Sequence, residues 1–177
     1  MGGVAKGLLP APGTGEPLVS RLCAVTRQAL PAARCVLVGA AEAYAELGIE
    51  ALADSPAGVG PIGGLRSLLE HAASESARAI AVACDLPYVG VDRLRQLGEA
   101  TSGPAVVAPR VDGIWQPLFA RYEPGLVLPA LCASLAAREH ALQRVLARLG
   151  DTVMELPLSE RERAELGDWD EPGDLPG

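Results

Sequence analysis

The stretch ARAIAVACDLPYVG (residues 77–90) decides the fold class of this chain. Residues 79–83 form an unbroken apolar run, which is typical of a β-strand covered on both faces. The run ends at Cys84-Asp85, Pro87 prevents a simple continuation, and residues 91–97 are predicted to form a helix. A buried strand that leads into a helix is the repeating unit of an α/β protein.

The same alternation extends along the whole chain, with no internal repeat or linker. We predict strands over 35–38, 49–53, 79–83, 105–108 and 152–156, and a segment over 115–122 that pairs antiparallel with its predecessor after the Asp112-Gly113 turn. We predict helices over 17–30, 41–47, 62–72, 91–97 and 126–149, the last interrupted near Pro129 or Ser134. The chain is therefore expected to form one α/β domain, residues 1–177, around a mostly parallel sheet.

The composition of the chain excludes several classes of function. The net charge of −7 argues against a nucleic-acid partner, which would need clustered Lys and Arg. No apolar run reaches membrane-spanning length and there is no signal-peptide core, so we expect a cytoplasmic protein without a membrane partner. Apolar residues make up 49% of the chain and aromatic residues 3%, so Ala, Leu and Val must build the core. The four cysteines show no CxxC pairing and are expected to be buried free thiols: Cys23, Cys35, Cys84 and Cys132.

Ligands of open parallel sheets bind beyond the carboxyl ends of the strands, which selects the candidate site residues. Asp85 follows the most apolar strand and could hold a hard cation with substrate phosphates, or cap the next helix. Gly60 and Gly64 in GVGPIGGL (58–65) allow close approach of a ligand to a helix N-terminus, although glycine-rich turns that bind nothing are common. Asp54 could accept hydrogen bonds from a ribose or a base, or cap a turn. Lys6 could contact phosphate, or be solvated.

Taken in order, six segments resemble the bacterial molybdenum cofactor guanylyltransferases and their nucleotidyltransferase relatives. These segments are MGGVAKGLLP (1–10), EPLVSRL (16–22), ADSPAGVGPIGGL (53–65), ACDLPYV (83–89), WQPLFARY (115–122) and DWDEPGDL (168–175). The resemblance implies a Rossmann-like, three-layer α/β/α sandwich. It also implies transfer of GMP from GTP to the molybdopterin cofactor with release of pyrophosphate and with Mg²⁺, and transient contact with molybdenum cofactor delivery proteins.

The resemblance assigns a role to each candidate. It makes Asp85 the Mg²⁺ ligand and Asp54 a contact to the sugar or base of GTP. For Asp170 it suggests a second metal ligand, but a helix N-cap is the better interpretation. The remaining implied contacts are to the triphosphate (Gly2, Gly3 and Lys6), to the base (Gly60, Pro61 and Gly64) and to the acceptor (Gln116 and Pro117).

The sequence departs from the family pattern at its start. The family begins with a strand that runs into a loop of the form LAGGxSxRMGxxK, and this chain starts at the Met of that pattern. We therefore expect the first strand and part of the glycine-rich loop to be absent, leaving unpaired edges on the flanking strands and lower stability. A CTP-dependent enzyme, a GTP-dependent enzyme with another acceptor, and a catalytically inactive homologue that binds a nucleotide or a partner are the alternatives.

Overall fold

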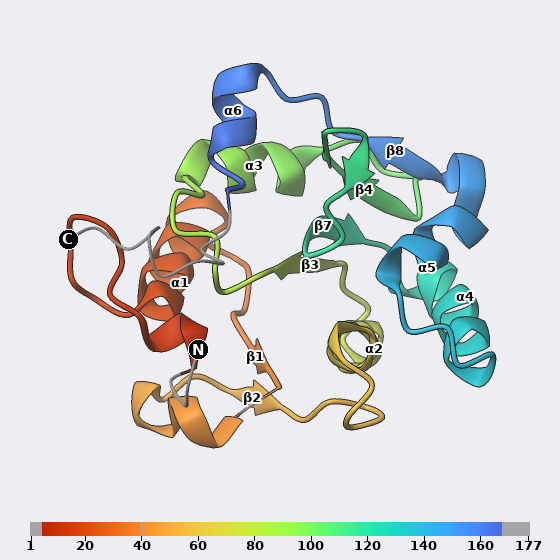
Figure 1. Ribbon diagram of the computed structural model, residues 1–177, viewed down its shortest axis with the longest axis horizontal. Helices are drawn as coiled ribbons and strands as arrows, with labels where there is room; N and C mark the ends of the chain where they lie inside the picture. Colours follow the sequence, from red (N-terminus) through yellow and green to blue (C-terminus); the bar gives the residue numbers. More distant parts are fainter. Residues whose placement is uncertain (1–4, 40, 168–177) are drawn as a thin grey trace.

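The computed structural model describes residues 5–39 and 41–167, and it has the expected alternation of helices and strands (Figure 1). The helices are η1 (Lys6–Leu8), α1 (Leu18–Ala29), η2 (Ala41–Leu47), α2 (Pro61–Ser74), α3 (Val91–Glu99), α4 (Pro124–Ala136), α5 (Leu142–Leu149), η3 (Gly150–Thr152) and α6 (Glu160–Ala164). The strands are β1 (Leu37–Val38), β2 (Ala51–Leu52), β3 (Ala79–Val82), β4 (Val106–Ala108), β5 (Arg110–Val111), β6 (Ile114–Trp115), β7 (Phe119–Tyr122) and β8 (Val153–Glu155).

The main sheet has four strands in the order β3-β7-β4-β8. Strand β7 is antiparallel to both of its neighbours, as predicted for β4, whereas β4 and β8 are parallel. Strands β1 and β2 form a separate parallel pair. The predicted Asp112-Gly113 turn joins β5 to β6, and both of its residues have positive φ, as a two-residue hairpin turn requires.

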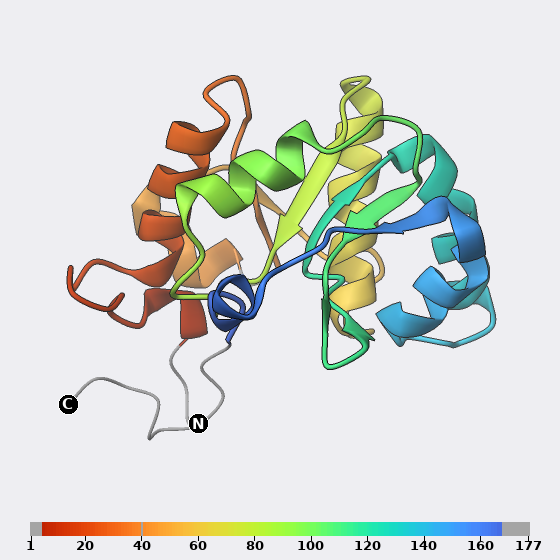
Figure 2. The same cartoon turned by 90° about the horizontal axis from the view of Figure 1, so that it is seen from above.

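Helices cover both faces of the sheet, which confirms the three-layer α/β/α arrangement (Figure 2). Neighbouring residues of a strand point to opposite faces, so Val106 packs with one helical layer and Val107 with the other. The first layer consists of α2, α4 and α5, and the second of α1 and α3. Fully buried apolar side chains such as Leu69 and Leu94 pack in the two interfaces.

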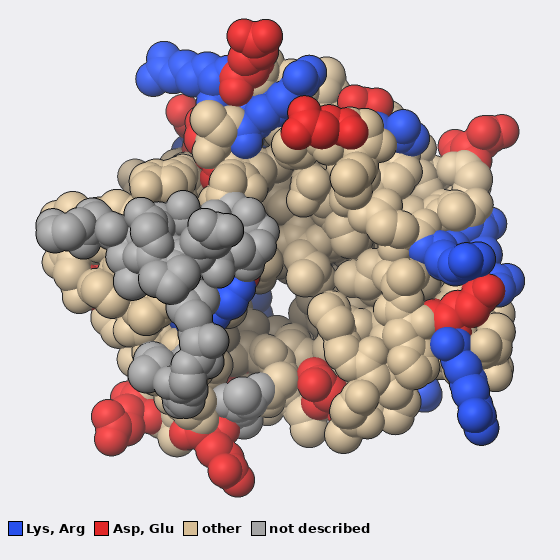
Figure 3. Space-filling view, in the orientation of Figure 1, with Lys and Arg blue, Asp and Glu red and all other residues tan. Residues whose placement is uncertain are grey.

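The β1-β2 pair and the four-stranded sheet are separate, and the division lies between β1 and β3. Among the described residues no strand pairs with either of the two edges that face this gap. A cavity of about 980 Å³ lies there, and the space-filling view shows an opening in the same region (Figure 3). The prediction that residues 35–38 are covered on both faces is wrong: Leu37 and Val38 line this cavity and are only half-buried.

The interruption of the 126–149 helix comes near Ser134, the second of the two predicted positions: α4 ends at Ala136, and Arg138 has a φ of 56°. Pro129, the first of the two positions, lies inside α4. A proline costs one backbone hydrogen bond, and burial of Val127 and Leu131 against the core holds the helix despite that loss. All four cysteines are free, as predicted, but only Cys23 is buried; Cys132 is exposed because it lies on the outer side of α4.

Candidate functional site

The predicted site residues gather where the carboxyl ends of β1, β2 and β3 meet. The Lys6 ammonium lies 3.1 Å from Oδ2 of Asp85, although 79 positions separate the two residues along the chain. Both side chains are partly exposed, at 38% for Lys6 and 21% for Asp85, so a ligand can reach them. The structure thus brings together the cation and the carboxylate to which the sequence assigned phosphate and metal contacts.

Tyr44 joins this pair to the end of β1, and the sequence analysis missed it. The Gly7 N–H donates a hydrogen bond to the Tyr44 hydroxyl at 3.3 Å, and a Cβ at Gly7 would lie only 2.8 Å from that oxygen. Burial, and then the neighbouring Cys84, raises the pKa of Tyr44. Burial, and then Asp85, raises the pKa of the Cys84 thiol. The one sequence feature that could have identified Tyr44 as a site residue is its position in the segment that directly follows β1.

Asp54 faces the glycine-rich start of α2. A Cβ on Gly64 would lie 3.1 Å from Oδ1 of Asp54, and a Cβ on Gly63 would lie 2.4 Å from the carbonyl oxygen of Pro56. Gly60 is the N-cap of α2, with a φ of 78°, and Pro61 is its first residue. These glycines let the loop after Asp54 lie directly against α2. The Asp54 carboxylate and the N-terminus of α2 therefore both line the cavity of about 980 Å³.

The Gln116-Pro117 segment lies near the end of β3. The Ala83 N–H donates to the Leu118 carbonyl at 2.7 Å, which holds the residue after this segment beside the end of β3. The Pro117 carbonyl accepts a hydrogen bond from the Tyr122 hydroxyl, whereas the half-buried Gln116 side chain donates to the Ile114 carbonyl at the surface.

Three predicted site residues, Gly2, Gly3 and Asp170, lie outside the described residues. Within the described part of the chain, no cluster of three or more His, Cys, Asp or Glu side chains could hold a metal by itself. Asp85 supplies one hard oxygen ligand, and this fits Mg²⁺, which commonly takes one or two carboxylates and completes its shell with substrate phosphates and water.

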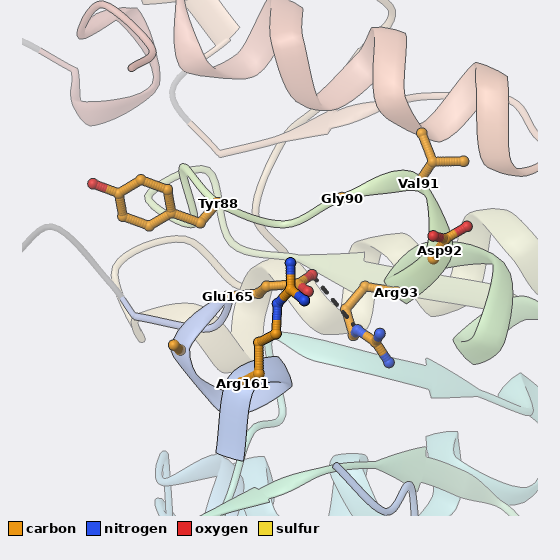
Figure 4. Close-up of a pocket in the computed structure, with 8 residues that line it drawn as sticks. Tyr88, Gly90, Val91, Asp92, Arg93, Arg161 and Glu165 are labelled. Carbon is orange, nitrogen blue, oxygen red and sulfur yellow. Dashed lines mark ion pairs between the residues drawn. The ribbon is translucent and has the colours of Figure 1, made fainter. Parts of the chain in front are cut away.

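A second pocket, of about 560 Å³, lies between the start of α3 and α6 (Figure 4). Its buried Arg93 forms ion pairs with Glu162 at 2.6 Å and with Glu165 at 3.5 Å, and these contacts fasten α6 to α3. None of the predicted site residues lines this pocket. The positive charge of Arg93 is already neutralised by Glu162 and Glu165. This pocket is therefore a weaker candidate for binding an anionic ligand than the site at Lys6 and Asp85.

Comparison with known proteins shows which family the chain resembles. The model of the MobA-like NTP transferase domain matches residues 1–153. A molybdenum cofactor guanylyltransferase of Pseudomonas putida is 34% identical over 173 residues, which are 92% of this chain and 83% of the relative. A probable molybdenum cofactor guanylyltransferase of Pelotomaculum thermopropionicum is 32% identical over 113 residues, 63% of this chain and 53% of the relative.

Two solved structures resemble the fold. One is molybdopterin-guanine dinucleotide biosynthesis protein A from Archaeoglobus fulgidus, with a TM-score of 0.71 and 23% identity, covering 98% of this chain and 91% of that chain. The other is 2-C-methyl-D-erythritol 4-phosphate cytidylyltransferase from Thermus thermophilus, with a TM-score of 0.67 and 19% identity, covering 97% and 91%. At these identities the likeness shows the fold alone.

Proposed function

The chain belongs to the MobA-like NTP transferase domain family, and on that premise we propose that it transfers GMP from GTP to the molybdopterin cofactor and releases pyrophosphate. The observation that carries the proposal is the Lys6–Asp85 pair, which lies just beyond the carboxyl end of β3. The named guanylyltransferases among the relatives favour GTP over CTP, and favour an active enzyme over an inactive homologue.

The reaction requires no protein nucleophile. A phosphate oxygen of the acceptor attacks the α-phosphorus of GTP; the new P–O bond forms as the bond to the β-phosphate breaks, and pyrophosphate leaves. Lys6 contacts the phosphates and stabilises the negative charge that increases on them in the transition state. Asp85 would hold Mg²⁺, which would supply further stabilisation of the charge on the phosphates.

Separate segments bind the two substrates. The Asp54 carboxylate accepts hydrogen bonds from the sugar or the base of GTP, and the glycines at the start of α2 let the nucleotide approach the helix N-terminus, whose free N–H groups favour an anion. Gln116 orients the acceptor. We extend the proposal to Mg²⁺ dependence, a cytoplasmic location and transient contact with molybdenum cofactor delivery proteins, all of which rest on the family.

Replacing Asp85 tests the proposal. Asp85→Asn keeps the size of the side chain but removes its charge, so we expect Mg²⁺-dependent formation of the guanylylated cofactor to fall at least about 100-fold. Product is measured by chromatography with GTP and molybdopterin as substrates. Asp92→Asn is the matched control, because Asp92 is 87% exposed and pairs only with Arg95 among the described residues; it should keep activity within about twofold. Activity of Asp85→Asn within a few-fold of the parent would refute the role of Asp85.

A further inference from the structure

Two cysteines on neighbouring segments have their thiols in contact. Cys23 lies in α1 and is buried, whereas Cys35 lies two positions before β1 and is half-buried. Residues 30–36 join these two elements (Figure 1). The thiols share a hydrogen bond, and both residues line the cavity of about 980 Å³. Two thiols in contact are the arrangement from which a disulfide forms.

The backbone on both sides of Cys35 is held by other elements. The Arg34 side chain forms ion pairs with Glu50 at 2.6 Å and with Glu75. On the other side, the Leu37 N–H donates to the Glu50 carbonyl at 2.8 Å. The thiol of Cys35 is therefore held toward α1 by contacts to β2 and to the end of α2, and its position does not depend on the connection from α1 alone.

The two thiols differ in charge. The hydrogen bond with Cys23 lowers the pKa of the Cys35 thiol to about 6; burial opposes this effect, and the charge of Arg27 adds to it. The same hydrogen bond, and then burial, raises the pKa of Cys23. At neutral pH Cys35 is therefore a thiolate, and Cys23 is the protonated donor beside it. An accessible thiolate next to a second thiol is typical of cysteines that are oxidised reversibly.

The other two cysteines have different surroundings. Burial, and then Asp85, raises the pKa of Cys84, and its hydrogen-bond partner is the Tyr44 hydroxyl rather than a thiol. Cys132 is exposed on the outer side of α4. These two residues are therefore internal controls for the reactivity of Cys35.

We propose that Cys23 and Cys35 form a reversible intramolecular disulfide by exchange with a low-molecular-weight disulfide such as glutathione disulfide. The Cys35 thiolate attacks one sulfur of the small disulfide, a new S–S bond forms as the old one breaks, and a thiolate leaves. Cys23 then gives its proton to that thiolate and attacks the Cys35 sulfur, which releases the second small thiolate. The two cysteines are oxidised, and the small disulfide is reduced to one thiol and one thiolate.

The first step prepares the second. The hydrogen bond and the charge of the Cys35 thiolate raise the pKa of Cys23, and both are lost when Cys35 is bound in the mixed disulfide. Cys23 can then lose its proton more readily and act as the resolving thiol. The resulting bond fastens α1 to the start of β1. None of the residues to which the proposed GMP transfer is assigned takes part, so this inference does not rest on that function.

The test is oxidation of the chain with glutathione disulfide at neutral pH, followed by alkylation of the remaining thiols and digestion with trypsin without reductant. Trypsin places each cysteine in a separate peptide, so mass spectrometry identifies every linked pair; the peptides are 22–27, 35–66, 79–93 and 122–138. The oligomeric state of the oxidised chain is measured on the same sample. A second measurement follows the rate of iodoacetamide alkylation at each cysteine as a function of pH.

We expect peptides 22–27 and 35–66 to be linked within a monomer and to separate on treatment with dithiothreitol. Cys23→Ser should keep glutathione on Cys35 as a stable mixed disulfide, because the resolving thiol is missing. Cys35→Ser should slow modification of Cys23 at least about tenfold, because the attacking thiolate is missing. Cys132→Ser is the matched control and should form the same link as the parent.

Alkylation of Cys35 should reach half of its maximal rate near pH 6, compared with about pH 8.5 for an ordinary cysteine. Cys23→Ala removes the hydrogen-bond donor and should raise this midpoint by about one pH unit or more, whereas Cys23→Ser keeps a donor and should raise it less. The proposal is overturned by an unlinked parent, by a link that involves Cys84 or Cys132, by a link only between two molecules, or by an ordinary midpoint for Cys35. The parent chain alone gives these four results, so they do not depend on the folding of a variant.

Discussion

Asp85 owes its position to the strand before it. Strand β3 pairs along its whole length with β7, so the residue that follows its carboxyl end is held at the edge of the sheet. Lys6 reaches the same point from the start of the chain, and Tyr44 closes the group through Gly7 and Cys84. A change of one side chain here alters a contact between segments that are distant in sequence, whereas the same change on an outer helix alters only local packing.

Gly63→Ala is expected to be destabilising. A Cβ at this position would lie 2.4 Å from the Pro56 carbonyl oxygen, a backbone atom that cannot rotate away, so the loop after Asp54 must shift. We expect a loss of about 1–3 kcal/mol in unfolding free energy, measured by urea denaturation. Gly125→Ala is the matched control, because it lies in α4 with nothing within 4 Å of its Cβ position; it should be neutral or slightly stabilising. Equal effects of the two substitutions would contradict the close approach at Gly63.

Among the elements, α6 shows how a short helix can be held in place without a large apolar face. None of the residues of α6 itself is buried. Its start is fixed by a capping box, in which the Ser159 N–H and hydroxyl donate to Oε2 of Glu162 at 2.7 and 2.8 Å. The same Glu162 pairs with the buried Arg93 of α3. One carboxylate thereby caps the helix and attaches it to the second helical layer.

Because Glu162 has both roles, we expect the stability of the folded protein to depend on pH. Hydrogen bonds from the Ser159 backbone and hydroxyl, and then the charge of Arg93, hold the pKa of Glu162 below its ordinary value. The folded protein therefore binds this proton less readily than the unfolded chain. The stability from Glu162 is fully present above the unfolded pKa of about 4.3 and is lost as pH falls through the lower folded pKa.

Glu162→Gln, which removes the charge but keeps a hydrogen-bond acceptor, should lower Tm at pH 7, and the difference from the parent should disappear as pH falls below about 4. The measurement is a series of thermal unfolding curves from pH 7 to pH 3. Glu160→Gln, in the first turn of the same helix, is the control and should show a smaller difference at pH 7. A difference between Glu162→Gln and the parent that persists unchanged at pH 3 would exclude the charge as its cause.

At the scale of the whole molecule, the net charge is −7. A nucleoside triphosphate is also negatively charged, so the protein as a whole repels it. In the proposed site Lys6 and the N-terminus of α2 offer positive potential, and a Mg²⁺ ion bound there would add to it. Anion binding should therefore depend on the metal more strongly than in a basic protein. Among the described residues, no helix is long and apolar enough to cross a bilayer.

GTP with Mg²⁺ should therefore stabilise the folded chain. At a GTP concentration about 100 times the Kd, linkage predicts a gain of about 2.7 kcal/mol, which is a rise in Tm of about 5–10 °C for a chain of this size. Removing the metal with EDTA should abolish most of the shift, and ATP in place of GTP should give a smaller one. The measurement is differential scanning calorimetry. An equal Tm with and without GTP would count against nucleotide binding at this site.

The local elements could be predicted from the sequence because their signals are local. The apolar run before Asp85, the spacing of α1 and α2 and the Asp112-Gly113 turn are properties of neighbouring residues, and each was found within a few positions of its predicted place. Asp85 and Asp54 could be selected because they follow predicted strands, whose carboxyl ends meet at one edge, and Lys6 because it lies beside glycines. Their chemical roles remain predictions.

The contacts between residues that are distant in sequence could be found only in the tertiary structure. The hydrogen bond of Gly7 to Tyr44 links positions 37 residues apart, and the Arg93 pair with Glu162 links positions on separate helices, so no local pattern marks either one. Pro129 was tolerated because packing outweighed its missing donor. The sequence alone determined the α/β alternation and the chemistry available at the strand ends. The folded chain determined that the unpaired edges belong to β1 and β3, because strand pairing is a long-range property.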